Sequence, residues 1–140
     1  MHLMINLILH YAEFNKIETD KDIVIQQLNP EGAISLYNKV NIYPHWEIRS
    51  INNYYNLITP HSVSLDGEVI GYFDMWVNHV SSIALKPNLI DSGIGKLFVS
   101  SVFEYGLNEF KHLKLSTDPD IDNPHAIKVY EALGCKFDDE

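Results

Sequence analysis

A glycine-rich turn near residue 93 has the composition of an anion-binding loop. It runs Pro87-Asn88-Leu89-Ile90-Asp91-Ser92-Gly93-Ile94-Gly95-Lys96 and separates a β-rich run from a long amphipathic segment. Glycine lets a backbone approach a ligand closely, and the first amides of a helix point outward at its electropositive end. The pattern predicts a pyrophosphate cradle, with a plain glycine-rich turn as the alternative. It lacks the third glycine of a dinucleotide fingerprint and the Gly-Lys-Ser/Thr of a P-loop.

A second block lies one predicted helix and one predicted strand downstream, with Asn123, Ala126, Tyr130, Glu131 and Gly134 at fixed spacing. Together with the turn and the Leu85-Lys86-Pro87 before it, this block resembles the GNAT family of N-acetyltransferases. In that family a strand ends in V-x-P, a loop R/Q-x-x-G-x-G/A opens a helix, and a later segment reads N-x-x-A-x-x-x-Y-E-x-x-G-F. The resemblance covers residues 79–137. Thr117-Asp118-Pro119 is most similar to the aminoglycoside 6′-N-acetyltransferases.

The resemblance implies an enzyme that moves an acetyl group from acetyl-CoA to an amine by direct attack, without a covalent enzyme intermediate. Backbone amides near Ile83 and Leu85 would bind the pantetheine arm and the thioester carbonyl. Asn123 matches the family residue that contacts pantetheine, and a plain helix N-cap is its alternative. Tyr130 matches the tyrosine that protonates the departing thiolate, and a core tyrosine is its alternative. The pyrophosphate would be held by Ser92, Gly93, Ile94, Gly95 and Lys96.

Two positions depart from the family pattern in the loop. Ile90 stands where the family has Arg or Gln, and Asp91 where Gly or a basic residue is common. A carboxylate beside a pyrophosphate repels it by about 1 kcal/mol unless it points into solvent. Lys96 offsets part of this repulsion. These departures motivate an alternative function, a non-catalytic domain that binds acyl-CoA.

The acceptor side offers two carboxylates and several aromatic side chains. Asp74, Trp76 and Asn78 would share one face of a strand because strand side chains alternate. That face either lines the acceptor site or is solvated. Asp118 is similar to the family residue that receives a cationic amine. Asp74 and Asp118 are therefore the candidates for a base, and the candidate acceptor-lining residues are Tyr43, His45, Trp46 and Trp76.

Metal and thiol chemistry find little support. The seven histidines show no metal-ligand spacing, and one cysteine rules out an internal disulfide. Cys135 shows no nucleophile signature with any histidine and is expected to be a buried thiol. We therefore expect no metal site. A single thiol is compatible with a reducing, cytoplasmic location.

Composition limits the partners. The chain has 140 residues, of which 46% are hydrophobic, enough for one folded domain with a core. Its 10 Lys and Arg against 19 Asp and Glu give a formal net charge of −9. This balance disfavours nucleic acid and anionic membranes as partners and suits a cationic small molecule. No apolar run is long enough to span a membrane, and residues 1–9 lack the cationic flank and cleavage site of a signal peptide.

The pattern of elements predicts a mixed α/β domain with a central sheet between helices. Apolar runs and turn signals predict strands at 4–11, 23–28, 61–65, 69–78, 79–85, 113–117 and 135–137. Capping and periodicity predict helices at 30–40, 45–58, 93–110 and 124–133.

The two ends of the sequence suggest a circular permutation. GNAT domains continue past the final G-F into a last strand that inserts into the sheet, whereas here residues 135–137 are followed by only three more residues. Residues 4–11 are similar to that missing strand, so we expect them beside the 113–117 strand. Alternatives are a strand exchanged from a second copy, or an extension of the first strand.

The sequence thus predicts one GNAT domain over residues 1–140, with residues 1–12 closing the sheet and 79–137 forming the acetyl-CoA-binding core. The expected substrate is a primary amine of a cationic small molecule, aminoglycoside-like or polyamine-like. A peptide or protein N-terminal acetyltransferase is the nearest enzymatic alternative. The aromatic residues and the short chain are compatible with a homodimer.

Overall fold

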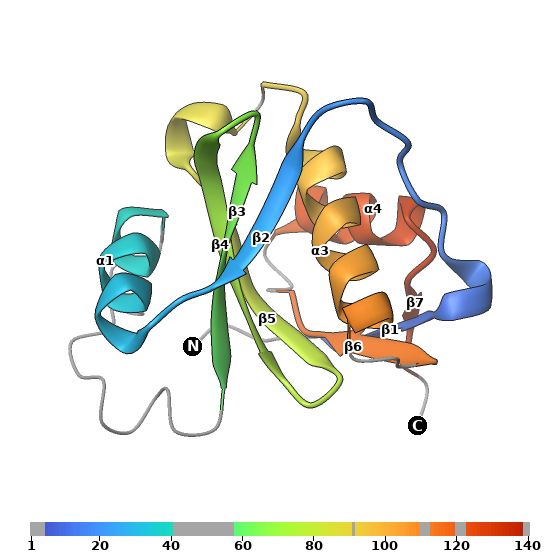
Figure 1. Ribbon diagram of the computed structural model, residues 1–140. Coiled ribbons are helices and arrows are strands. Elements are labelled where there is room, and N and C mark those ends of the chain that lie inside the picture. The colour runs from blue at the N-terminus through green and yellow to red at the C-terminus, as the bar shows by residue number, and fades with distance from the viewer. Residues whose placement is uncertain (1–4, 41–57, 91, 110–112, 120–122, 139–140) are drawn as a thin grey trace.

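Seven strands form one mixed sheet in the computed structural model, which describes residues 5–40, 58–90, 92–109, 113–119 and 123–138 (Figure 1). Their order across the sheet is β2-β3-β4-β5-β6-β1-β7. The strands are β1 (Leu7–His10), β2 (Ile23–Gln27), β3 (Thr59–Leu65), β4 (Glu68–Trp76), β5 (His79–Leu85), β6 (Lys114–Thr117) and β7 (Lys136–Phe137). The α-helices are α1 (Pro30–Val40), α3 (Gly95–Glu109) and α4 (Pro124–Ala132), and the short 3-10 turns are Tyr11–Glu13 and Pro87–Leu89. The mixed sheet between helices confirms the predicted fold class.

Helices cover both faces of the sheet (Figure 1). Helix α1 packs on β3, β4 and β5 from one side, where Tyr37 meets Tyr72 edge to face with ring centroids 5.2 Å apart. Asn29 caps α1 because its side-chain oxygen accepts a hydrogen bond from the Gly32 amide at 2.7 Å. Helices α3 and α4 lie on the other side over the main core. The largest fully buried apolar side chains there are Leu7, Leu9, Phe73, Phe103, Leu107, Leu115 and Leu133.

Strand β1 lies in the middle of the second half of the sheet. It pairs antiparallel with β6, Leu7 opposite Thr117, and antiparallel with β7, Leu7 opposite Phe137. The expectation that residues 4–11 lie beside the 113–117 strand is confirmed, over a shorter span. The alternative of an extension to the first strand is wrong, because β1 and β2 lie on opposite sides of β6. Leu7 and Leu9 are buried because alternation turns both toward α3 and α4.

One predicted strand ends earlier than expected. We predicted a strand to Asn78 with Asp74, Trp76 and Asn78 on one face, but β4 ends at Trp76 and Val77–Asn78 form the turn to β5. Val77 has φ 56°, a left-handed conformation that costs a β-branched residue conformational energy. No propensity signal marks such a turn, whereas the Asp66-Gly67 turn between β3 and β4 was predicted from its residues.

A strap of residues 14–22 carries the chain from β1 across α3 to β2 (Figure 1). The Asn15 amide donates to the Leu133 carbonyl at 2.9 Å, and the Ile17 amide donates to Ser100 Oγ at 2.9 Å. The strap therefore holds α3 and the end of α4 from outside. No helix in the described part of the chain is long and apolar enough to cross a membrane. The predicted helix at 45–58 lies almost wholly outside the described residues.

Candidate functional site

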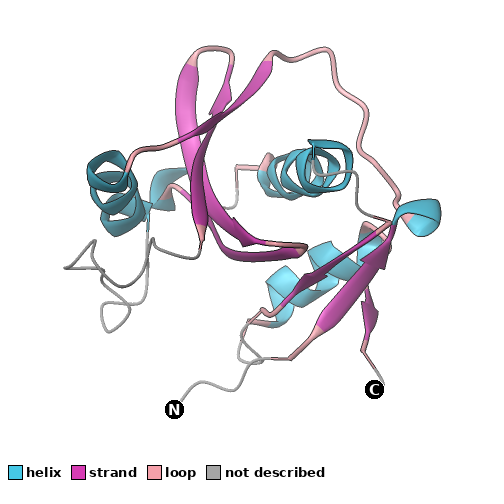
Figure 2. Cartoon of the chain, turned by 60° about the horizontal axis from the view of Figure 1, so that its bottom comes forward, coloured by secondary structure: helices cyan, strands magenta, loops and turns pink. Residues whose placement is uncertain are grey.

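Strands β5 and β6 part beyond their first two residue pairs. They run parallel, with His79 opposite Ser116 and Val80 opposite Thr117, and no further pair joins them in the described chain. Strand β5 continues to Leu85 paired only with β4. The two carboxyl ends therefore diverge, and the loops that leave them face one another across an opening. Figure 2 shows β6 and β1 turning away from the β2–β5 half of the sheet.

A bulge shapes the β5 side of this opening. The β4–β5 register shifts between Tyr72 and Asp74, and Ser82 opposite this shift has φ 54°. The Lys86 amide donates to the Ile70 carbonyl at 2.8 Å, toward β4. Since successive strand amides point in opposite directions, those of Ile83 and Leu85 point away from β4, toward the opening. Two backbone donors on one strand edge can hold a carbonyl oxygen or an amide of an extended ligand.

The glycine loop follows β5 and leads into α3. A Cβ at Gly93, which has φ 91°, or at Gly95 would meet no atom within 4 Å, so the space before the helix is open. The first intrahelical bond runs from the Phe98 amide to the Ile94 carbonyl at 2.9 Å, so the preceding amides of the first turn have no acceptor within the helix. This loop can accept an anion by its shape. Ser92 contributes least, because its amide and hydroxyl both donate to the Leu89 carbonyl.

Helix α4 carries two further residues of the predicted site. Asn123 caps the helix, and its side-chain oxygen accepts from the Ala126 amide at 3.2 Å, as predicted for an N-cap. Tyr130 is 6% exposed, with its ring edge-on to Phe103 at a centroid distance of 5.5 Å. Burial, followed by the charges of Cys135 and Asp118, raises the pKa of Tyr130 well above its ordinary 10. The phenol therefore stays protonated at neutral pH, as a proton donor must.

Polar side chains line the sheet on the α1 side of the opening. Asp74 is 0% exposed and accepts hydrogen bonds from the Tyr72 hydroxyl at 3.1 Å and the Ser81 hydroxyl at 2.5 Å. The alternative that Asp74 is solvated is therefore wrong. His79, two residues before Ser81, lies on the same face. Its Nδ1 lies 2.7 Å from Ser116 Oγ, and its Nε2 lies 3.2 Å from Asp118 Oδ1.

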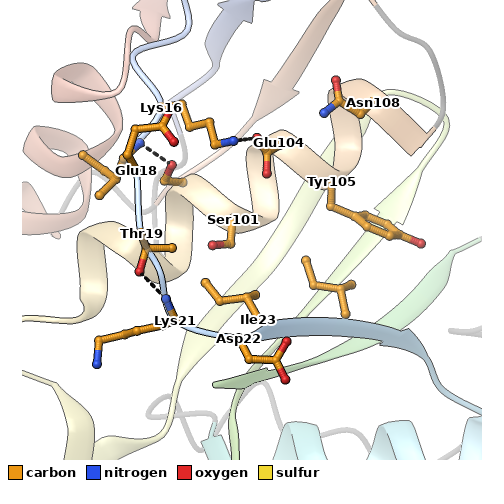
Figure 3. Close-up of a pocket in the computed structure, with 13 residues that line it drawn as sticks. Lys16, Glu18, Thr19, Lys21, Asp22, Ile23, Ser101, Glu104, Tyr105 and Asn108 are labelled. Carbon is orange, nitrogen blue, oxygen red and sulfur yellow. Dashed lines mark hydrogen bonds and ion pairs between the residues drawn. The ribbon is translucent and has the colours of Figure 1, made fainter. Parts of the chain in front are cut away.

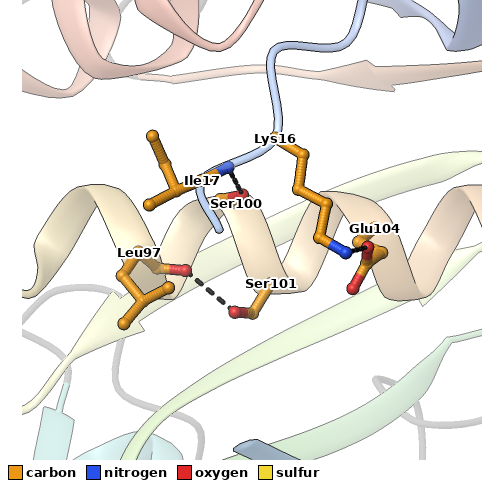
Figure 4. Close-up of polar contacts among 6 residues, drawn as sticks. All are labelled: Lys16, Ile17, Leu97, Ser100, Ser101 and Glu104. Atoms are coloured by element: carbon orange, nitrogen blue, oxygen red, sulfur yellow. Dashed lines mark hydrogen bonds and ion pairs between the residues drawn. The ribbon is translucent and has the colours of Figure 1, made fainter. Parts of the chain in front are cut away.

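A separate cavity of about 490 Å³ lies between the strap, β2 and α3 (Figure 3). Lys16 and Glu104 form an ion pair at its rim, and the Ile17–Ser100 hydrogen bond lies beside it (Figure 4). The lining residues are Lys16, Ile17, Glu18, Thr19, Lys21, Asp22, Ile23, Ile25, Ser100, Ser101, Glu104, Tyr105 and Asn108. None of the predicted site residues is among them, so this cavity is not the candidate site.

Comparison with known proteins identifies the family. The model of the acetyltransferase (GNAT) family matches residues 25–135. The chain belongs to this family. Members of the GNAT family use acetyl-CoA, and the expected enzyme class, an N-acetyltransferase, is the class of this family. No curated protein matches the sequence.

Solved structures share this GNAT fold at low sequence identity. A Drosophila protein superposes with a TM-score of 0.69 at 14% identity, over 96% of this chain and 47% of its own. A chimera of the Vibrio cholerae spermidine N-acetyltransferase SpeG and hSSAT gives 0.61 at 14% identity, over 79% and 78%. An aminoglycoside 6′-N-acetyltransferase in complex with CoA gives 0.59 at 17% identity, over 89% and 94%. The chain spans about half the length of several solved proteins that it matches, from 47% to 61%.

The GNAT fold gathers part of the predicted site. The amides of Ile83 and Leu85, the glycine loop, Asp118 and the start of α4 all lie at the carboxyl ends of the parallel pair β5 and β6. Trp76, the last residue of β4, is 55% exposed and lies opposite His79, at the amino end of β5. The predicted acceptor-lining residues Tyr43, His45 and Trp46 lie outside the described residues.

One polar residue beside the candidate site was not predicted from the sequence. His79 has no motif around it, and its two partners lie 37 and 39 positions away. Only the parallel pairing of β5 with β6 brings them together. Cys135 is buried as expected, and burial raises the pKa of its thiol to about 12, which makes it a poor nucleophile.

Proposed function

We propose that this GNAT domain transfers the acetyl group of acetyl-CoA to a primary amine of a cationic small molecule. The observation that carries the proposal is the opening between β5 and β6. On the described chain, strand amides that point away from β4 line one side of it, an open glycine turn follows β5 at the start of α3, and α4 carries Tyr130, which stays protonated. Strand amides can polarise a thioester carbonyl, a glycine turn at a helix start can hold a pyrophosphate, and a protonated tyrosine can donate to a departing thiolate.

The residues present fit acetyl-CoA. The amides of Ile83 and Leu85 would hold the pantetheine arm and the thioester carbonyl, and Asn123 would contact the arm beside them. The open space before Gly93 and Gly95 leaves room for a pyrophosphate. Ser92, Ile94 and Lys96 complete the proposed cofactor-binding set. Residues 79–137 would then form the acetyl-CoA-binding core of a single domain over residues 1–140.

Three groups of this chain would assist the transfer of the acetyl group. Bound acetyl-CoA supplies an activated acetyl thioester. The amides of Ile83 and Leu85 stabilise the negative charge that develops on the carbonyl oxygen as the amine attacks. Tyr130 donates its proton to the departing thiolate.

A cationic acceptor suits the acidic character of the domain. The net charge is −9. Asp74 bonds to Ser81 of β5, and Asp118 pairs with His79 of the same strand. Two of the structurally similar proteins are named as spermidine and aminoglycoside N-acetyltransferases. Such amines are cations at neutral pH and are drawn to an acidic site.

Calorimetry with CoA, followed by acetyl-CoA turnover over spermidine, an aminoglycoside and peptide amines, tests the proposal. We expect CoA to bind and a polyamine or aminoglycoside to be acetylated. Absence of CoA binding overturns the proposal. Binding without turnover on any amine would favour a non-catalytic acyl-CoA-binding domain, and turnover on peptides alone would favour a peptide or protein N-terminal acetyltransferase.

A charge variant tests the cradle itself. Gly95→Asp places a carboxylate in open space at the first turn of α3, so we expect CoA affinity to fall by about tenfold or more while the fold stays intact. Ser35→Asp adds the same charge on the exposed face of α1 and should leave CoA affinity unchanged. Equal affinities for the two variants would place the pyrophosphate elsewhere.

A further inference from the structure

His79 joins two strands through both of its ring nitrogens. Nδ1 lies 2.7 Å from the hydroxyl of Ser116 on β6, and Nε2 lies 3.2 Å from the carboxylate of Asp118 just after β6. The His79 side chain is 28% exposed and that of Asp118 39% exposed, so the cluster is accessible from solvent. We call this cluster of Ser116, His79 and Asp118 the β5–β6 triad.

The partners of the imidazole determine its tautomer. An ionised carboxylate can only accept hydrogen bonds, so Nε2 carries the hydrogen that points at Asp118. Nδ1 then holds a lone pair, and the Ser116 hydroxyl donates to it. The serine oxygen keeps its own lone pairs for a third group. A proton that arrives at Ser116 therefore has a continuous path to His79.

The triad lies where the proposed reaction takes place. His79 and Ser116 form one of the two residue pairs that join β5 to β6 before the strands part. Asp118 follows β6 directly, so the triad spans the point where the two strands part. A base that takes the proton of the amine and a separate acid that serves the thiolate are the arrangement that acid–base catalysis uses.

We propose that the β5–β6 triad accepts the proton that the substrate ammonium must lose before it attacks. This inference rests on the proposed N-acetyltransferase function. The ammonium gives a proton to Ser116 Oγ while the Ser116 hydroxyl gives its own proton to His79 Nδ1. The freed lone pair on nitrogen forms the C–N bond as the C–S bond breaks. The thiolate takes its proton from Tyr130, and the resulting tyrosinate takes the second proton that the nitrogen loses as the neutral amide forms. The imidazolium, paired with Asp118, later returns its proton through Ser116 to solvent.

Two carboxylates of the described chain act on His79. The hydrogen bond that His79 donates to Asp118 raises the pKa of His79 above its ordinary 6.5, and burial opposes this shift. The charges of Asp118 and of Asp74, on the neighbouring strand β4, add to the rise. A base with a pKa closer to neutrality accepts a proton more readily and is still unprotonated in an adequate fraction of molecules. Asp118 is thus a positioning residue, which acts through His79.

NMR titration of His79 in the free protein tests the arrangement without turnover. We expect a pKa above 6.5 in the native chain and a lower one in Asp118→Asn, because the amide no longer stabilises the imidazolium. An unchanged titration in Asp118→Asn overturns the assigned pairing. This measurement needs no substrate, so it stands apart from the test of acetyl transfer.

Turnover as a function of pH tests the role in catalysis. We expect kcat/KM to fall toward low pH as His79 becomes protonated. In Asp118→Asn this acidic limb of the profile should move to lower pH by the same amount as the pKa of His79 measured by NMR. His79→Gln and Ser116→Ala should each lower kcat by about a hundredfold with CoA affinity kept. His10→Gln, an exposed histidine on β1, is the matched control and should leave the profile unchanged.

The outcomes distinguish a failure of the triad from a failure of the proposed function. An active native enzyme whose turnover is unaffected by His79→Gln overturns the triad and leaves the proposed function standing. An acetyl group found on Ser116 by mass spectrometry overturns the relay in favour of a covalent route. If the native protein acetylates no amine, both the proposed function and the proposed role of the triad are overturned.

Discussion

Asn6 and Asp138 are joined by two hydrogen bonds across 132 positions of sequence. The Asp138 amide donates to the Asn6 carbonyl at 3.0 Å, and the Asn6 side-chain amide donates to the Asp138 carboxylate at 2.7 Å. These bonds extend the β1–β7 ladder beyond its two residue pairs. They hold β1 between β6 and β7, the position that the resemblance assigns to the last strand of the family. The permuted order of strands is our interpretation of this placement.

Truncation of β1 should destabilise the whole domain. Leu9 is 1% exposed in the main core, so Leu9→Ala should lower the free energy of unfolding by about 2–5 kcal/mol. His10→Ala, exposed on the same strand, should change it by less than about 0.5 kcal/mol. Urea denaturation measures both. Deletion of residues 1–12 should abolish cooperative unfolding, and a soluble, cooperatively folding monomer after that deletion would refute the inserted-strand interpretation.

Two glycines with similar backbone angles should respond differently to alanine. Gly134 has φ 111°, and a Cβ there would lie 2.2 Å from the Glu13 carbonyl oxygen, whereas Gly67 has φ 88° and an open surrounding. Gly67→Ala should cost about 1 kcal/mol from backbone strain alone. Gly134→Ala should cost at least about 3 kcal/mol, because the strain is joined by a steric clash. Thermal unfolding of the two variants gives the difference, and equal losses would mean that the 3-10 turn Tyr11–Glu13 does not pack on Gly134.

Two neighbouring serines on α3 differ in their hydrogen-bond partners, since one bonds to the strap and the other to the helix itself (Figure 4). Ser100 Oγ accepts the Ile17 amide, whereas the Ser101 hydroxyl donates to the Leu97 carbonyl of its own helix at 2.9 Å. Ser100→Ala should cost about 1–3 kcal/mol, since the Ile17 amide loses its acceptor. Ser101→Ala should be nearly neutral because alanine favours the helix. Hydrogen exchange over residues 14–22 should accelerate in Ser100→Ala alone, and equal exchange in both variants would contradict the tether.

The sequence was most informative where local signals coincide with the fold. The Asn123 cap, the Asp66-Gly67 turn and the glycine loop before α3 depend on neighbouring residues, and the structure has the predicted elements at each. His79 and the Val77–Asn78 turn could not be predicted in this way. The turn places a β-branched residue at positive φ against its propensity, and the His79 contacts arise only when two strands 37 positions apart pair in parallel.

Removal of the Tyr130 hydroxyl should separate catalysis from binding. Tyr130→Phe keeps the ring against Phe103, so the fold and the CoA affinity should stay close to native. Turnover should fall by about a hundredfold, because the thiolate loses its proton donor. Tyr11→Phe, on an exposed tyrosine, is the control. Unchanged turnover in Tyr130→Phe would remove this residue from the mechanism.

Acid sensitivity of the fold should depend on His61. This side chain is fully buried, stacked on Phe73 with ring centroids 4.6 Å apart, and burial lowers its pKa to about 4. Below pH 6.5, the ordinary pKa of histidine, His61 of the unfolded chain binds a proton, whereas His61 of the folded chain stays neutral until about pH 4. Stability from this group is therefore complete above pH 6.5 and is lost as the pH falls toward 4.

His61→Phe should remove this contribution, since phenylalanine keeps the stack and cannot titrate. Between pH 7 and pH 4.5 the native protein should lose about 2–3 kcal/mol more unfolding free energy than the variant. Urea denaturation at the two pH values measures this difference. His10→Gln, which removes an exposed histidine, should lose as much as the native chain. An identical loss in His61→Phe and the native chain would show that other groups set the acid limit of the fold.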